Sequence, residues 1–167
     1  MKGDLLKKHS ALALIIALFV FLAACQSKQP PPSPTSFTAT AQITFEQKRF
    51  TARLEQTCPG SLWLDFSAPA ELKGMSIRIE GGTAIVQYGK MELSLPTPSL
   101  PQAGFAHLLN EVLLRLAQSA PESFRRTADG WELNAQADTF AYTAFIDTQG
   151  MLRTLQIPRA ALTIELT

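Results

Sequence analysis

Hydrophobic and polar residues alternate along most of the chain after residue 36. In FTATAQITF, residues 37–45, one face of an extended segment carries Phe37, Ala39, Ala41, Ile43 and Phe45, and the other face carries threonine and glutamine. A period of two is typical of a strand with one buried face. The same pattern predicts further strands within 49–57, 62–67, 75–80, 83–88, 90–95, 123–127, 131–135, 138–147, 151–157 and 161–166.

The period changes once, after prolines at positions 96, 98 and 101. Apolar residues then recur at intervals of three and four, which is the spacing of one helix face. The pattern predicts one amphipathic helix from about Gln102 to Gln118, and Pro121 ends the helical region. Its apolar face contains Phe105, Leu108, Leu109, Val112, Leu113 and Leu116.

These elements predict a mainly β, α+β fold. Short turns such as Cys58-Pro59-Gly60 and Gly81-Gly82 join successive strands, so neighbours should pair antiparallel. A twisted sheet of about nine to ten strands curls to bury one face. We therefore expect a curved antiparallel sheet, an unclosed half-barrel, with the helix covering its concave face. Pro158 predicts an edge position or a bend.

The first 24 residues have the pattern of a secretory signal peptide. Lys2, Lys7 and Lys8 precede an uncharged apolar run over residues 11–24. That run is shorter than the roughly 20 residues that span a bilayer, which disfavours a permanent membrane-spanning helix.

The run ends in Leu22-Ala23-Ala24-Cys25, which resembles the bacterial lipobox. The resemblance implies cleavage before Cys25 and attachment of acyl chains, such as palmitate, to its thiol; a buried core cysteine is the disfavoured alternative. Lipidation converts a secreted chain into a membrane-anchored one. Residues 25–36 would then be the lipidated cysteine and a proline-rich, extended tether, and residues 37–167 a single β domain.

Charge and chemistry restrict the function further. The full chain has 15 basic and 14 acidic side chains, of which three lysines and one aspartate lie in the leader. Without the leader, 12 basic and 13 acidic side chains remain, which gives a net charge of −1. Nothing in this balance argues for nucleic-acid binding, which requires a basic face. The pair Arg125-Arg126 is typical of a solvated strand or turn edge. Once Cys25 is lipidated, Cys58 has no intramolecular disulfide partner.

Catalytic and metal chemistry is also unsupported. Apart from the lipidated cysteine, the mature chain has one cysteine, Cys58, and one histidine, His107, which cannot make a zinc site. Carboxylates could bind calcium weakly. His107 fits the border of the helix's apolar face, and Trp63 faces away from its apolar neighbours in the strand. The sequence contains no phosphate-binding loop and no convincing acid–base pair, so we expect no enzyme, no metal and no cofactor.

The order of elements resembles the LolA/LolB-like family of bacterial lipoprotein carriers. The resemblance rests on an opening hairpin, FTATAQITFEQKRFTARLEQ, on GSLWLDFSAPAELKG, on the glycine hairpin IRIEGGTAIVQYGKMELSL, and on the closing pair FIDTQGMLRTLQIPRAALTIEL. It implies an unclosed barrel whose apolar cavity binds lipid or the acyl chains of lipoproteins. Inward residues that would line such a cavity are Phe50, Leu64, Phe66, Ile77, Ile79, Leu109, Leu113 and Leu116.

Two functions remain open. The first is a non-catalytic, membrane-anchored lipoprotein that binds lipid or acyl chains in an apolar cavity. The second is an anchored interaction or scaffold lipoprotein whose core is filled and whose outer face meets an envelope protein.

Either protein would lie in the cell envelope, on the extracytoplasmic side. For a bacterium with two membranes, the resemblance to lipoproteins implies that Gln26, a residue other than aspartate after the lipidated cysteine, permits delivery to the outer membrane. In a bacterium with one membrane, the protein would sit on the outer leaflet of the cytoplasmic membrane.

Overall fold

The computed structural model describes residues 35–99, 104–120 and 123–167. The fold below is that of Pro31–Thr167, one of the two units into which the chain divides. The predicted signal peptide, the lipidation at Cys25 and most of the tether lie outside the described residues.

The described chain forms eleven strands, one α-helix and short 3-10 turns at Ala70–Leu72, Thr97–Ser99 and Pro158–Ala160. The α-helix is α2, Phe105–Gln118. The strands are β1 Phe37–Phe45, β2 Lys48–Gln56, β3 Leu62–Ala68, β4 Met75–Glu80, β5 Thr83–Tyr88, β6 Met91–Pro96, β7 Arg125–Arg126, β8 Gly130–Gln136, β9 Ala141–Asp147, β10 Leu152–Ile157 and β11 Leu162–Leu166.

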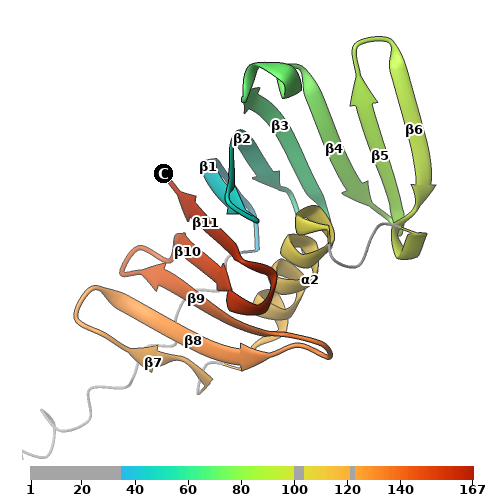
Figure 1. The fold of residues 1–167 in the computed structure, drawn as a ribbon. Helices are drawn as coiled ribbons and strands as arrows, with labels where there is room; N and C mark the ends of the chain where they lie inside the picture. The colour runs from blue at the N-terminus through green and yellow to red at the C-terminus, as the bar shows by residue number, and fades with distance from the viewer. Residues whose placement is uncertain (1–34, 100–103, 121–122) are drawn as a thin grey trace, which may run out of the picture. The chain divides into compact units, whose positions relative to one another are not determined.

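All eleven strands belong to one antiparallel sheet in the order β6-β5-β4-β3-β2-β1-β11-β10-β9-β8-β7. The chain lays down half the sheet, crosses through α2, and builds the other half so that β11 returns to β1 (Figure 1). Ile43 and Ile164 are direct neighbours across this central seam. The sheet has eleven strands where about nine to ten were predicted, and the shortest, β7, keeps only Arg125 and Arg126 of the predicted strand 123–127.

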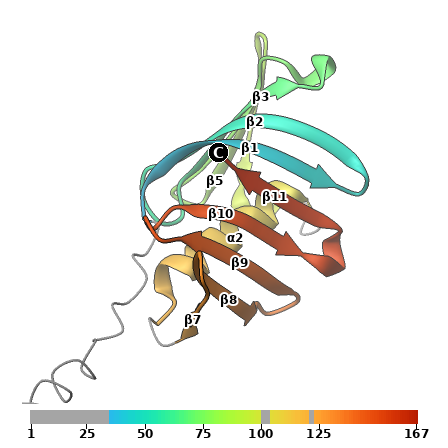
Figure 2. The ribbon, with the colours of Figure 1, turned by 90° about the vertical axis from the view of Figure 1, so that its left-hand side faces the viewer.

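The core lies between the inner face of the sheet and α2. Alternate residues of each inner strand are buried, as in β3, where Leu62, Leu64 and Phe66 are covered and Trp63 and Asp65 are exposed. Figure 2 shows α2 within the curve of the sheet. The helix buries six residues in that direction: Ala106, Leu108, Leu109, Val112, Leu113 and Leu116. The predicted mainly β, unclosed half-barrel with one covering helix is confirmed.

Two local predictions are refined by the structure. The helix begins at Phe105, with Gly104 as its N-cap, while the predicted start at Gln102 lies outside the described residues. Pro158 makes a bend and not an edge, because it opens a 3-10 turn between β10 and β11, both interior strands of the sheet. Proline is compatible with this place because the first turn of a helix needs no N–H from it.

Candidate functional site

The predicted cavity residues come together in one buried cluster between the sheet and α2. Phe50 is half-buried, and the other seven are at most 8% exposed: Leu64, Phe66, Ile77, Ile79, Leu109, Leu113 and Leu116. In this arrangement they pack against one another as a hydrophobic core.

Four phenylalanines close the core where α2 begins. The Phe105 ring stacks on the Phe50 ring, with centroids 5.6 Å apart, and meets the edge of Phe66 at 6.1 Å. Phe45 lies 5.8 Å from Phe105. Such pairs add to the gain from burying the rings. The predicted lining residues Phe50 and Phe66 are therefore held by the helix itself.

The apolar inner face continues past this core onto the β5–β6 hairpin. Ile77 of β4 lies opposite Val86 of β5, which lies opposite Leu93 of β6. Residues directly opposite in an antiparallel pair point to the same face. Ala84, on the same face, is fully buried. We call the other five inner-face residues of this hairpin the inner wing: Val86, Tyr88, Met91, Leu93 and Leu95.

Exposure rises along the inner wing toward the end of the sheet. Ile77 is 8% exposed, whereas Tyr88 is 44%, Leu93 59% and Met91 69% exposed. Figure 1 shows the hairpin at the end of the sheet, away from α2. The inner wing is therefore an open apolar surface that runs directly into the core.

Sequence reasoning missed the inner wing as a site. The alternation of Met91, Leu93 and Leu95 placed them on one face, but it carried no information on how far a covering helix would reach. A signal was nevertheless available. The last hairpin before the proline break carries an apolar stripe, two strands beyond the strand that contains Ile77 and Ile79.

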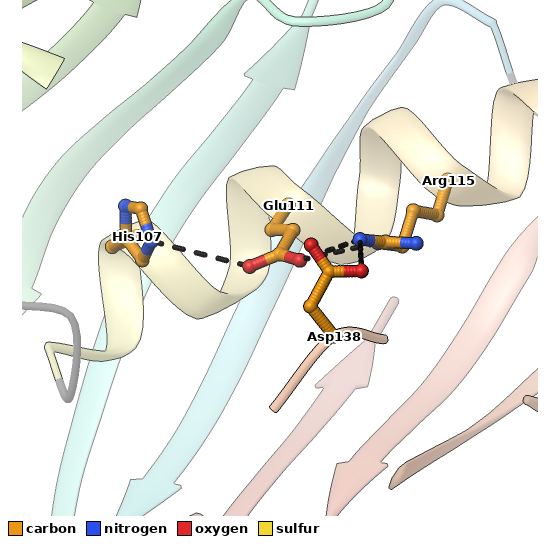
Figure 3. A network of polar contacts seen from close by, with 4 residues as sticks. All are labelled: His107, Glu111, Arg115 and Asp138. Atoms are coloured by element: carbon orange, nitrogen blue, oxygen red, sulfur yellow. Dashed lines mark hydrogen bonds and ion pairs between the residues drawn. The ribbon is translucent and has the colours of Figure 1, made fainter. Parts of the chain in front are cut away.

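Helix α2 carries a polar network on the side away from its buried, core-facing residues (Figure 3). Arg115 Nη2 lies 3.1 Å from Glu111 Oε1 and 2.9 Å from Asp138 Oδ1, which links the helix to the turn between β8 and β9. The hydrogen bond to Asp138 raises the pKa of Arg115, Glu111 raises it further, and burial opposes both. This network fastens the helix over the core.

His107 continues the same row of helix residues. Its Nε2 lies 4.0 Å from Glu111 Oε2, and its buried Nδ1 has no hydrogen-bond partner among the described residues. The half-buried position agrees with the predicted border of the apolar face. Neither contact positions a nucleophile, and Cys58 is an exposed, free thiol in a different part of the fold.

A second surface feature lies on the outer face of the sheet, around Trp63. The Arg78 guanidinium sits 4.4 Å from the centre of the Trp63 ring, which remains 38% exposed. A hollow of about 220 Å³ is lined by Trp63 and Arg78 together with Glu55 and Glu80. A hollow of about 120 Å³ adjoins Trp63 on the side of Ser76, Gln87 and Glu92.

Metal and membrane-spanning features can be assessed over the same residues. No group of three histidine, cysteine or carboxylate side chains in the described ranges is arranged to hold a metal ion. Within those ranges, no helix has both the length and the apolar character needed to cross a bilayer.

Comparison with known proteins gives likenesses of structure. No family profile and no curated protein sequence matches the chain. An uncharacterized conserved protein from Thermus thermophilus aligns over 80% of this chain and 76% of its own, with 14% identity and a TM-score of 0.50. A LolA superfamily protein from Nitrosomonas europaea aligns over 80% of this chain and 84% of its own, with 9% identity and a TM-score of 0.40. At these identities the likeness concerns the fold alone, which here is one unclosed antiparallel sheet with a covering helix.

Proposed function

We propose that the protein is a membrane-anchored, non-catalytic lipoprotein of the cell envelope that binds an acyl chain on the inner wing. The observation that carries this proposal is the continuity of the inner face, from buried Ile77 through Val86 to exposed Leu93. A monomeric protein seldom leaves a contiguous apolar surface of large side chains in water unless the surface binds something.

The chemistry of the inner wing suits a flexible hydrocarbon chain. Its side chains are aliphatic, aromatic and thioether groups, and Met91 can adapt its three rotatable bonds to an irregular ligand. Each methylene that leaves water contributes about 0.8 kcal/mol. The aromatic cluster of Phe45, Phe50, Phe66 and Phe105 lies at the far end of the same face, where helix movement would lengthen the site.

Native mass spectrometry tests the ligand. The mature chain, residues 25–167 with Cys25→Ser, should carry a lipid mass after purification without detergent. Leu93→Asn should lower the occupancy because an amide on the inner wing interrupts the apolar path. Ile85→Asn makes a similar polar change on the outer face of the same hairpin and should leave occupancy unchanged. A lipid-free wild-type spectrum, or equal losses in both variants, would contradict acyl binding at this place.

The anchor in this proposal is the lipid on Cys25, which would leave residues 26–36 as the link to the domain. Cells that express the full chain and are fed radioactive palmitate should yield a labelled protein. Cys25→Ser should abolish the label, and Cys58→Ser should retain it, because Cys58 belongs to the folded domain. Label that persists after Cys25→Ser would place lipidation elsewhere.

The outer face favours a second candidate function, docking of an envelope protein. Exposed tryptophan and arginine are the residue types that most often dominate binding energy at protein interfaces, and Trp63 and Arg78 lie together there. A photo-crosslinker in place of Gln87, beside the outer hollow, should capture one defined protein in living cells. Trp63→Ala should abolish this product, while Tyr88→Ala, on the inner face, should preserve it.

A further inference from the structure

Strand β6 has one hydrogen-bonding edge that no described strand occupies. It is the first strand in the sheet order and pairs only with β5. At the opposite end, β7 is only two residues long, whereas β6 has six. A long, open edge strand is a template for pairing with another strand.

The geometry of the β5–β6 hairpin identifies the backbone groups at that open edge. Gly89 and Lys90 form a two-residue turn between the opposite residues Tyr88 and Met91, which is the arrangement in which the flanking pair is hydrogen-bonded. At the other end, the Thr97 N–H donates to the Gly82 carbonyl at 2.8 Å. Hydrogen-bonded pairs alternate with non-bonded ones.

It follows that Met91, Leu93 and Leu95 use their backbone groups on β5. Glu92 and Ser94 direct their N–H and C=O groups away from β5, toward the open edge. Their side chains lie on the outer face, because they alternate with the inner-wing residues. The open edge thus offers two donors and two acceptors, from Glu92 and Ser94.

We infer that a second copy of this chain pairs antiparallel with β6 about a two-fold axis at Leu93. In this register the Glu92 of each copy lies opposite Ser94 of the other. The two residues of each such pair exchange two N–H···O=C bonds, so the dimer gains four backbone hydrogen bonds. No like charges face each other. A two-fold interface of this kind is self-complementary and closed.

The neighbouring registers are worse for specific reasons. An axis at Glu92 sets two carboxylates directly opposite, which is destabilising. An axis at Ser94 sets Pro96, which has no N–H, opposite Glu92 and leaves a hydrogen bond unmade. The sequence of β6 therefore selects the Leu93 axis.

The inner-face side chains agree with the same register. Leu93 of one copy would lie beside Leu93 of the other, and Met91 beside Leu95. Leu93 and Met91 are 59% and 69% exposed in the single chain, and pairing would cover part of both. The two inner wings would then form one continuous apolar surface across the axis.

Size-exclusion chromatography with light scattering tests the inference on the mature chain with Cys25→Ser. The wild type should have twice the mass of one chain at high concentration. Ser94→Pro should be monomeric, because it removes an edge N–H that β5 does not use, and Ser94→Thr should stay dimeric. A monomeric wild type at every concentration, or a Ser94→Pro dimer of undiminished affinity, would overturn the pairing.

Charge variants test the register independently of proline and its effect on folding. Ser94→Lys places lysine opposite Glu92 twice in each dimer and should tighten the dimer about two- to thirtyfold, whereas Ser94→Glu should weaken it by a similar factor. Equal effects of the two variants would contradict the Leu93 axis. Since position 94 faces away from the inner wing, Ser94→Glu should retain bound lipid, so failure of dimerisation and failure of acyl binding are distinguishable.

Discussion

The ring of Phe105, the first residue of α2, stacks on the ring of Phe50 in β2, with the two planes inclined by 21°. This contact joins the only described helix to the half of the sheet that precedes it. The Arg115–Asp138 ion pair joins the same helix to the half that follows it. The helix therefore holds both halves of one open sheet around a common core.

Removal of the Phe105 ring should loosen this arrangement. Phe105→Ala deletes contacts to three other phenylalanine rings. Since the ring is only half-buried, the free energy of unfolding should fall by about 2–3 kcal/mol, less than for a fully buried phenylalanine. Urea denaturation measures the change. Tyr88→Ala, which removes a 44% exposed ring, should cost less than about 1 kcal/mol. Equal costs for the two variants would show that the cluster adds little stability.

Asp147 should make stability dependent on acid. Burial alone would raise the pKa of its carboxyl, but hydrogen bonds from Met151 and Gln149 N–H and from Arg153 outweigh burial and lower the pKa below its usual value. A carboxylate with a lowered folded-state pKa stabilises the fold above its unfolded pKa of about 3.9, and this stabilisation is lost as pH falls through the folded pKa.

Substitution of Asp147 tests this dependence. Asp147→Asn should lower the free energy of unfolding by about 1–2 kcal/mol at pH 7, and the difference from wild type should shrink as the pH falls below about 4. Asp129→Asn, on an exposed turn, should stay within about 0.5 kcal/mol of wild type. A difference for Asp147→Asn that is constant from pH 7 to pH 2 would contradict the role assigned to the charge.

Gly130 should be irreplaceable for a steric reason. It has φ 157°, and a Cβ added there would lie 2.1 Å from the Ile146 carbonyl oxygen and 2.8 Å from Asp147 Cα. Backbone atoms cannot move aside cheaply, so Gly130→Ala should cost more than about 2 kcal/mol. Gly81→Ala, also at positive φ but in open space, should cost about 1 kcal/mol. Thermal unfolding compares the two, and equal losses would indicate backbone strain as the common cause.

Much of the fold was predictable because short-range patterns determine it. The alternation in FTATAQITF assigned five residues to the inner face of β1. The structure buries Phe37, Ala41 and Ile43 and half-buries Ala39 and Phe45. The change of period after the prolines likewise found the buried face of α2. The pairing of β1 with β11 did not follow from any local pattern, because it joins segments more than 110 residues apart.

The candidate site was less predictable. Alternation tells which side of a strand is apolar but not what covers it, so Leu64 and Leu93 are indistinguishable by pattern. In the structure Leu64 is fully buried under the helix region and Leu93 is 59% exposed. The difference arises because α2 is only 14 residues long and the sheet extends past it. How much of the sheet the helix covers depends on tertiary packing, which the local sequence pattern does not report.

The most direct test of acyl binding on the inner wing uses the methionine methyl groups. Beyond residue 1, the chain has Met91 in the inner wing, Met75 beside the inner wing on β4, and Met151 at the turn before β10. In a methyl NMR titration of the mature chain with palmitate, the Met91 and Met75 resonances should shift together and saturate, while Met151 stays in place. A shift confined to Met151, or no shift of Met91 at saturating palmitate, would contradict the account.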